Sequence, residues 1–313
     1  MILLLGATGY VGKEFERVLS LRGIKLKSLR RAQIDYTSAP HLRAYLAANR
    51  PDFIINAAGF TGKPNVDACE LQKEETMQGN VHFPKMLAEV CAELGIPWGH
   101  VSSGCIFSGC FVEQGGKWIA EKNMSRDYIR KIALNEPSRL KGFDESFTPN
   151  FSFSDGPCSY YSGTKALGEE AIKGIGSHYV WRLRIPFSGT NNPRNYLTKI
   201  QTYSKVYDNL NSLSHLEDFA NACINCWLNH VPYGTYNVTN PGFISTRQVV
   251  DMVKKILKID RDFVFWESDE EFYRLAAKTL RSNCILDSSK LLCAGITMRS
   301  VEEALADSLS RWE

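Results

Sequence analysis

The stretch that decides the fold is Met1-Ile2-Leu3-Leu4-Leu5-Gly6-Ala7-Thr8-Gly9-Tyr10-Val11-Gly12, at the start of the chain. Its continuous apolar run is typical of a strand buried on both faces. Glycines at the spacing GxxGxxG follow, and residues 13–21 predict a helix directly after them. Such glycines allow a tight turn, a close approach of the backbone to a pyrophosphate, and close packing of helix on sheet. We therefore predict a dinucleotide site over Gly6, Thr8, Gly9, Tyr10, Val11 and Gly12.

Apolar runs and amphipathic stretches continue to alternate through the first half of the chain. We expect further strands at 24–29, 53–57, 98–102 and 179–185, and helices at 39–49, 80–94 and 161–172. This alternation predicts an α/β fold with a doubly wound parallel sheet, the NAD(P)-binding Rossmann fold. We expect residues 1–186 to form that domain. Residues 187–313 are expected to be a smaller, mixed, substrate-binding part, interleaved with the last sheet elements.

Residues 109–157 interrupt the alternation. The segment is rich in Gly, Lys, Asn, Ser and Phe, and only one helix is predicted in it, near 126–134. Loops of this length in compact domains are commonly lids or specificity elements. We therefore expect an insertion next to the site.

Composition narrows the possible partners. The net charge of +3 is too small to indicate a nucleic-acid partner, but it is compatible with an anionic small substrate. No stretch approaches the ~18–20 apolar residues of a membrane span, and the apolar run at 1–5 is too short for a secretory signal. Nine cysteines at irregular spacing fit free thiols in a cytoplasmic protein. Cys223 and Cys226 form a CxxC, but they lie in an apolar helical stretch, so we expect buried thiols and no metal.

The end of the second predicted strand indicates which dinucleotide binds. NAD-binding proteins place an acid there to hold the ribose 2′-hydroxyl. This chain has Ser28-Leu29-Arg30-Arg31, with no acid. Two guanidinium groups suit a 2′-phosphate. Arg30 and Arg31 therefore predict NADP, with NAD and a pair of solvated surface arginines as the alternatives.

A catalytic group is predicted at Tyr161-Ser162-Gly163-Thr164-Lys165. The i, i+4 spacing on a helix places the phenol and the ammonium on one face. The ammonium lowers the tyrosine pKa toward the working pH, as a proton donor to a carbonyl requires. Ser103 ends a strand, where it can hold the substrate oxygen. Tyr160 is one residue out of this spacing.

Together these residues resemble the extended short-chain dehydrogenases over nearly the whole chain. The turn Asn56-Ala57-Ala58-Gly59 is similar to the cofactor-lining turn of that family. The resemblance implies that Asp35 meets the adenine and that Asn80 is the structural asparagine of the following helix. It also adds Tyr161, Lys165 and Pro186 to the cofactor site.

A narrower resemblance is to the bifunctional 3,5-epimerase/4-reductases that make nucleotide-linked L-rhamnose, and more distantly to the dTDP-4-dehydrorhamnose reductases. Five segments carry it: 56–67 (NAAGFTGKPNVD), 104–107 (GCIF), 192–200 (NPRNYLTKI), 236–242 (YNVTNPG) and 281–283 (RSN). The implied substrate-binding residues are Thr61, Lys63, Ser103, Gly104, Cys105, Asn195, Lys199 and Arg281.

The same resemblance implies two more catalytic residues. Cys105 matches a cysteine base that removes a proton next to the ketone, and Lys199 matches a lysine that returns a proton on the opposite face. The alternatives are a buried thiol at a strand end and a solvated helix lysine. The segment between Phe107 and Tyr160 is longer than in those enzymes, which predicts a reshaped sugar pocket.

We therefore expect NADPH-dependent reduction of a nucleotide-linked 4-keto-6-deoxy sugar, with prior 3,5-epimerisation. The alternatives are a monofunctional 4-ketoreductase, a redox-neutral nucleotide-sugar epimerase or dehydratase, and a non-catalytic NADP-binding regulator. The resemblance also implies a homodimer through the helices at 80–94 and 161–172.

Overall fold

A six-stranded sheet forms the centre of the computed structural model, which describes residues 1–313. All its neighbouring strands are parallel, in the order β13-β8-β4-β3-β1-β2. The strands are β1 (Ile2–Leu5), β2 (Leu26–Leu29), β3 (Phe53–Asn56), β4 (Trp98–Ser103), β8 (His178–Leu183) and β13 (Gly234–Asn237). The predicted doubly wound α/β fold is confirmed.

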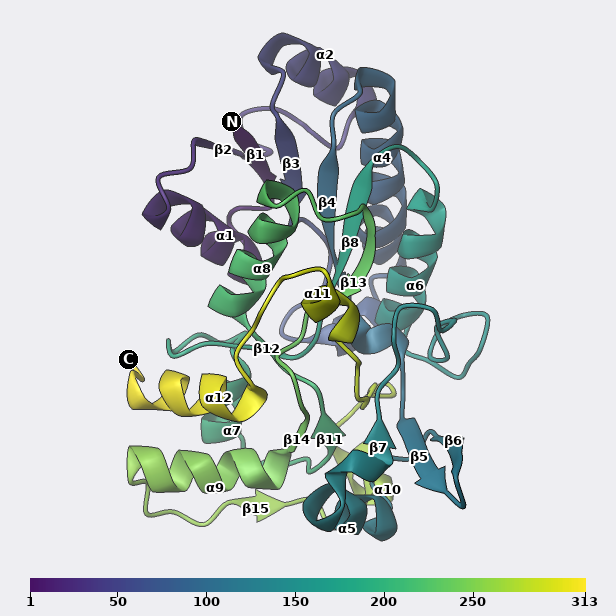
Figure 1. The fold of residues 1–313 in the computed structure, drawn as a ribbon, viewed down its shortest axis with the longest axis vertical. Helices are drawn as coiled ribbons and strands as arrows, with labels where there is room; N and C mark the ends of the chain where they lie inside the picture. Colours follow the sequence, from purple (N-terminus) through teal and green to yellow (C-terminus); the bar gives the residue numbers. More distant parts are fainter.

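Helices cover both faces of this sheet, as Figure 1 shows. One layer contains α1 (Tyr10–Leu21) and α8 (Leu216–Leu228). The other contains α2 (Ala39–Asn49), α4 (Phe83–Leu94) and α6 (Tyr160–Ile172). Ile2 and Leu4 enter the core beneath the first layer, whereas Leu3 and Leu5 enter the core beneath the second. Because both faces of β1 are buried, the strand is apolar at every position.

The predicted helix at 80–94 is divided in the structure. A short 3-10 helix, η1 (Val66–Glu70), precedes α3 (Lys73–Met77), and a π-helical turn, η2 (Gln78–His82), leads into α4. Gly79 lies in this turn against Phe60, where an added Cβ would be 2.8 Å from Phe60 Cβ. This close approach leaves no room for a side chain at position 79.

The C-terminal part lies below the carboxyl edge of the sheet. Its helices are α7 (Tyr196–Thr202), α9 (Thr246–Leu257), α10 (Asp269–Leu275), α11 (Ser289–Cys293) and α12 (Val301–Ser310). Short strands connect them: β9 (Pro186–Phe187), β10 (Lys205–Val206), β11 (Leu210–Asn211), β12 (Ser214–His215), β14 (Ile244–Ser245) and β15 (Val264–Phe265). This part of the chain also returns β13 and α8 to the central sheet and its helical layer. None of the helices combines the length and apolar character that a membrane span needs.

The insertion at 109–157 has its own secondary structure. The predicted helix is present as α5 (Asp127–Asn135), followed by η4 (Pro137–Arg139). An antiparallel sheet in the order β6-β5-β7 was not predicted; it consists of β5 (Cys110–Gln114), β6 (Lys117–Glu121) and β7 (Leu140–Lys141). Val112 and Ile129 share a small core with Leu210 and Ile285, so the insertion is packed against the C-terminal part.

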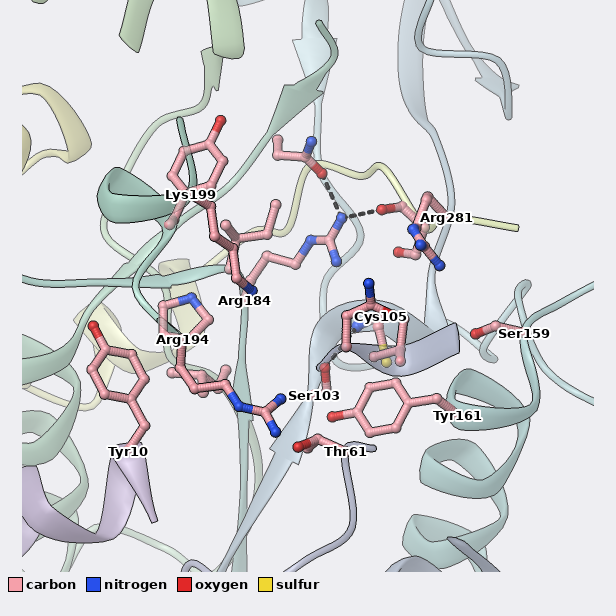
Figure 2. A pocket seen from close by; sticks show the side chains of 18 of the residues that line it. Tyr10, Thr61, Ser103, Cys105, Ser159, Tyr161, Arg184, Arg194, Lys199 and Arg281 are labelled. Atoms are coloured by element: carbon pink, nitrogen blue, oxygen red, sulfur yellow. Dashed lines mark hydrogen bonds between the residues drawn. The ribbon is translucent and has the colours of Figure 1, made fainter. Parts of the chain in front are cut away.

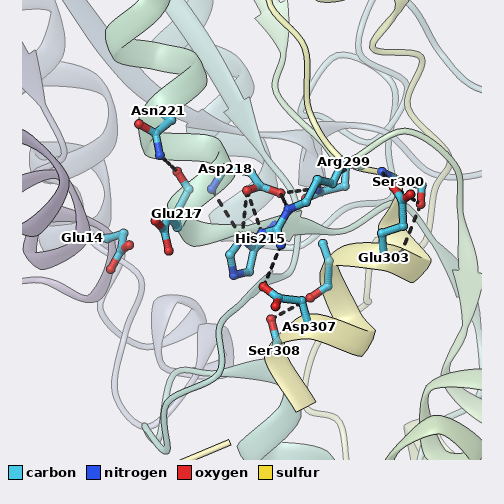
Figure 3. A network of polar contacts seen from close by, with 12 residues as sticks. Glu14, His215, Glu217, Asp218, Asn221, Arg299, Ser300, Glu303, Asp307 and Ser308 are labelled. Atoms are coloured by element: carbon cyan, nitrogen blue, oxygen red, sulfur yellow. Dashed lines mark hydrogen bonds and ion pairs between the residues drawn. The ribbon is translucent and has the colours of Figure 1, made fainter. Parts of the chain in front are cut away.

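A partly buried ionic network joins α8 to α12 (Figure 3). Arg299 donates two hydrogen bonds to Asp218, at 2.8 and 3.1 Å, and a third to Asp307 at 2.7 Å. Asn240 donates to the same Asp218 carboxylate at 2.8 Å. Burial opposes ionisation of Asp218, but hydrogen bonds from His215 and Arg299 outweigh burial and lower its pKa to about 2.

We expect Asp218→Asn to lower the free energy of unfolding by about 2 kcal/mol at pH 7. The stabilisation by Asp218 is complete above its ordinary pKa of 3.8 and is lost as the pH falls toward about 2. Urea unfolding at pH 7 and pH 3 measures it, and the gap between variant and wild type should narrow at the lower pH. Asp262→Asn, at a fully exposed ion pair with Lys254, is the control. An equal loss at both pH values contradicts this assignment.

Candidate active site

A cavity of about 1020 Å³ lies between the carboxyl edge of the sheet and the C-terminal part. Most of the residues predicted for the site line it: Thr8, Gly9, Tyr10, Val11, Ala57, Ala58, Gly59, Thr61, Lys63, Asn80, Ser103, Cys105, Tyr161, Lys165, Pro186, Lys199 and Arg281. The cavity therefore joins the predicted cofactor, catalytic and substrate residues in one continuous space.

The remaining predicted residues lie outside the cavity wall. Arg30, Arg31 and Asp35 are exposed on the turn after β2. Gly6 and Gly12 belong to the glycine turn but do not line the cavity. Asn56 and Gly104 are buried and do not line it either.

Asn195, predicted to bind substrate, is fully buried and does not line the cavity. Its side chain accepts a hydrogen bond from Leu197 N at 3.0 Å, which caps α7. It also donates to the carbonyls of Ser188 and Thr190, at 2.8 and 2.7 Å. We revise this prediction: Asn195 fixes the start of the helix that carries Lys199, and it does not face the ligand space.

The glycine turn is built so that only glycines fit at two positions. Gly6 has φ of +81°, and an added Cβ would lie 2.5 Å from Ala58 N. A Cβ on Gly12 would lie 2.1 Å from the Gly6 carbonyl oxygen. Helix α1 starts directly after the turn, without a side-chain cap and without an acid in its first turn. Its first N–H groups and its positive dipole end therefore fit a phosphate group.

The turn after β2 lies beside this phosphate-binding end. The register pairs Leu5 with Leu29, so that Gly6 and Arg30 follow at the same level of the sheet. Hydrogen bonds from Thr37 lower the pKa of the exposed Asp35, with smaller contributions from His41 and Arg31. Neither Arg30 nor Arg31 pairs with a carboxylate, so both guanidinium groups are available to a 2′-phosphate.

Ser103, at the end of β4, and Tyr161, in the first turn of α6, lie close together (Figure 2). Lys165, one turn further along α6, lines the same cavity. The Ser159 hydroxyl caps α6 by accepting from Ser162 N at 3.1 Å, which fixes the first turn that holds Tyr161. Burial raises the pKa of Tyr161, against the lowering effects of a hydrogen bond with Ser103 and of the Arg194 charge. Burial lowers the pKa of Lys165. The lysine can therefore give up its proton more readily than an exposed lysine.

Cys105 follows Ser103 in η3 (Gly104–Ile106) and is almost fully buried. Burial raises the pKa of the Cys105 thiol, whereas hydrogen bonds with Ser103 and Ser162 and the charge of Arg184 oppose that rise. Arg184 is itself buried, and its guanidinium donates to neutral oxygens of Asn211 and Ser282. Its Nε has no partner. The cavity thus contains a buried cation without a carboxylate.

Three further cations line the cavity. Burial, and then the charges of Arg194 and Arg281, lower the pKa of Lys199. Arg281 forms a two-pronged ion pair with Asp67, at 2.7 and 2.8 Å. Arg194 donates to the Gly62 carbonyl at 2.6 Å and faces Ser103 and Tyr161 (Figure 2). Lys199 and Arg194 have no carboxylate partner, so this region has an excess of positive charge.

An aromatic group closes the end of the cavity distant from the glycine turn. Tyr207 stacks on Phe272 with ring centroids 3.9 Å apart, and Trp266 packs edge-on against Phe272 at 6.0 Å. All three line the cavity. The sequence analysis missed them because Tyr207 and Trp266 follow short strands and Phe272 lies in the short helix α10, and only the fold brings these segments together.

The insertion does not form the lid that was expected. None of its residues lines the cavity. It instead contacts the aromatic end from outside, because Ser125 donates to Asp269 at 2.7 Å and Asp269 accepts from the Tyr207 hydroxyl at 2.8 Å. The expected reshaping of the sugar pocket therefore has no direct structural counterpart.

Comparison of the sequence with known proteins identifies relatives of this chain. Residues 1–125 match the family described as RmlD substrate binding domain. The chain is 32% identical over 304 residues to a bifunctional dTDP-4-dehydrorhamnose 3,5-epimerase/dTDP-4-dehydrorhamnose reductase of Arabidopsis thaliana, covering 97% of this chain and 90% of that protein. It is 31% identical to the trifunctional protein RHM1 of the same plant, of whose length it spans only 40%.

Solved structures show the same fold. The L780 UDP-rhamnose synthase of Acanthamoeba polyphaga mimivirus superposes with a TM-score of 0.82 at 23% identity, over 99% of this chain and 98% of that one. A dTDP-4-dehydrorhamnose reductase of Bacillus anthracis, solved in complex with NADP, gives a TM-score of 0.75 at 18% identity, over 99% and 97%.

Proposed function

Because the chain belongs to the family of dTDP-4-dehydrorhamnose reductases and bifunctional epimerase/reductases, we propose that it reduces a nucleotide-linked 4-keto-6-deoxy sugar with NADPH. One observation carries the proposal. Ser103, Tyr161 and Lys165 line one cavity together with the glycine turn, two cations without a carboxylate partner and a group of aromatic rings. A non-catalytic regulator has no need of this catalytic group.

The proposed reduction uses the catalytic group as follows. The bound nicotinamide supplies the hydride. Ser103 donates a hydrogen bond to the C4 oxygen of the sugar and holds it near Tyr161. Tyr161 gives its phenolic proton to that oxygen as the alcohol forms. The positive charge of Lys165, one helical turn away, stabilises the tyrosinate that remains.

The cofactor fits the glycine-turn end of the cavity. The residues that would hold it are Thr8 to Val11 at the pyrophosphate and Ala57 to Gly59 beside it, with Pro186 at the nicotinamide end. Arg30 and Arg31 would hold the 2′-phosphate. The nucleotide sugar then occupies the other end, where Arg194 and Arg184 meet its negative charge and the Tyr207–Phe272 pair stacks on its base.

Epimerisation before reduction is the finer part of the proposal. The Cys105 thiolate removes a proton from the carbon beside the ketone, which leaves an enolate, and the Lys199 ammonium returns a proton on the opposite face. Two features support it: both residues line the cavity, and the unpaired Arg184 charge favours the Cys105 thiolate.

The burial of Cys105 favours a second candidate, a monofunctional 4-ketoreductase. Because burial raises the pKa of this thiol, it is protonated at neutral pH in the free protein. In that case Cys105 only fills space behind Ser103, and a separate enzyme supplies the epimerised ketone.

Assembly and location complete the proposal. We propose a homodimer through α4 and α6, as the family resemblance implies. We also propose a cytoplasmic location, which the free cysteines suit, and no nucleic-acid partner, because the net charge is small. Light scattering on the purified chain measures the assembly, and substitution of the exposed α4 residues Lys85 and Glu89 should weaken the dimer if it forms there.

We expect Tyr161→Phe and Lys165→Met each to lower kcat by about 10²–10⁴-fold, because each removes part of the proton-transfer group. NADPH oxidation with UDP-, dTDP-, GDP- and CDP-linked 4-keto-6-deoxy sugars measures the effect. Tyr160→Phe is the matched control, since Tyr160 lies next to Tyr161 but packs against Phe153. Absence of oxidation with every one of these sugars overturns the reductase proposal.

Cys105→Ala separates the two candidate functions. In D2O, the wild-type protein should give a reduced product that carries deuterium at C3 or C5. The deuterium content of the variant's product should be lower by about tenfold or more, while the variant still reduces a ketone that is already epimerised. Cys293→Ala, at an exposed thiol, should behave as wild type. A wild-type product without label at either carbon supports the monofunctional reductase instead.

The cofactor preference depends on the turn after β2. The double variant Arg30→Ala/Arg31→Ala should raise KM for NADPH by about tenfold or more and leave KM for NADH almost unchanged, since only NADPH has the 2′-phosphate. Lys25→Ala, at the opposite end of β2, is the control. An equal effect on the KM values of both cofactors shows that the two arginines do not bind the 2′-phosphate.

A further inference from the structure

His100 is a buried titratable group that the proposed chemistry does not use. It lies on β4, three residues before Ser103, and is only 1% exposed. Its ring lies between two polar side chains: Asn56 at Nδ1 and Lys165 at Nε2. The ring thus links the end of β3 to the proposed catalytic lysine.

The hydrogen bonds around Asn56 fix the tautomer of His100. The Oδ1 of Asn56 accepts a hydrogen bond from Ala58 N at 3.0 Å. If the amide were reversed, its Nδ2 donor would face the Ala58 N–H donor. Its Nδ2 therefore faces His100 Nδ1, 3.1 Å away, and donates to it. An Nδ1 that accepts carries no hydrogen, and a neutral imidazole then has its proton on Nε2. An imidazolium would oppose the Asn56 donor.

This tautomer has a consequence for Lys165. The Nε2–H of His100 points at Lys165 Nζ, 3.5 Å away, and the same Nζ donates to the Val101 carbonyl at 3.1 Å. An ammonium group has three donors and no acceptor, so it cannot accept the Nε2 proton. A neutral amine has a lone pair and can accept it while it still donates to Val101. The arrangement therefore stabilises the amine of Lys165 relative to the ammonium.

We propose that His100 is a positioning residue that stabilises the amine left when Lys165 gives up a proton, so that the Lys165 ammonium is a stronger acid and returns a proton to Tyr161 after each turnover. This proposal rests on the proposed reductase function. The O–H bond of Tyr161 breaks when the sugar oxygen takes its proton. The tyrosinate then takes a proton from the Lys165 ammonium, and the resulting amine accepts the His100 hydrogen bond. Water finally returns a proton to the amine.

The other titratable groups near this pair are consistent with that role. Burial first, and then the charges of Lys165 and His178, hold the pKa of His100 well below its ordinary value, so the ring stays neutral. Cys105 and Glu169 raise the pKa of Lys165 and oppose the effect of burial. Glu169, however, forms an ion pair with Arg182 at 2.8 Å and accepts a hydrogen bond from the Ser102 hydroxyl. No anion pairs directly with Lys165.

The tautomer can be measured on the full chain without substrate or cofactor. Long-range 1H–15N correlation spectra of 15N-histidine-labelled protein distinguish the two neutral tautomers from imidazolium, and His100→Gln identifies the signal. We expect the Nε2–H tautomer at every pH from 6 to 9. Observation of the Nδ1–H tautomer or of imidazolium overturns the proposal, whether or not the chain is a reductase.

The effect on Lys165 is tested with two substitutions. A glutamine at position 100 can accept from Asn56 and donate to Lys165, whereas a leucine can do neither. In 13C-lysine spectra of the free protein, assigned with Lys165→Met, His100→Leu should raise the pKa of Lys165 by about one unit. His100→Gln should restore the wild-type value. A folded His100→Leu protein with an unchanged Lys165 pKa overturns the proposal.

The same pair of variants has a kinetic readout. Because His100→Leu stabilises the ammonium, the alkaline limb of the pH profile of kcat should move upward by about one pH unit, and kcat at pH 7 should fall about tenfold. A merely structural role lowers stability without moving that limb. If the wild-type chain reduces no sugar, the proposed function fails, and the two spectroscopic measurements still decide the tautomer and the Lys165 pKa.

Discussion

The turns that follow β1 and β3 touch one another, and the geometry of the site depends on this contact. Gly6 approaches the backbone of Ala57 and Ala58 so closely that an added Cβ would lie 2.5 Å from the Ala58 nitrogen. The Asn56 side chain accepts a hydrogen bond from Ala58 N and forms another with His100 on the next strand. The path from the glycine turn to Lys165 therefore runs through short, directional contacts across neighbouring strands, which leave little freedom for any of these groups.

The distribution of charge in the cavity separates groups that hold the fold from groups that can meet a ligand. Arg182 and Arg184 are both buried, yet Arg182 pairs with Glu169 at 2.8 Å whereas Arg184 contacts only neutral oxygens. An isolated buried charge is costly unless something compensates it. The unpaired guanidinium groups of Arg184 and Arg194 favour an anionic ligand in this part of the cavity.

Some of this structure could be predicted from the sequence because it depends on local patterns. The helix at 39–49 has the predicted bounds, with Pro40 in its first turn, where proline is favoured. Strand β4 and helix α6 differ from prediction by one residue at an end. The i, i+4 spacing of Tyr161 and Lys165 identified one face of a helix. His100 was missed because its importance comes from partners 44 and 65 residues away. The sheet of the insertion was missed because β6 is exposed along its length and shows no clear alternation.

Two contacts tie the loop after β3 to the segment after α10. Arg281 pairs with Asp67, and the Thr279 hydroxyl donates to Glu70 at 2.6 Å. Glu70 also accepts from the backbone of Tyr160, directly before Tyr161. The loop after β3, the segment after α10 and the start of α6 are therefore joined through one carboxylate. Because each of these three segments contributes residues to the cavity, its wall is a single connected structure and not three independent loops.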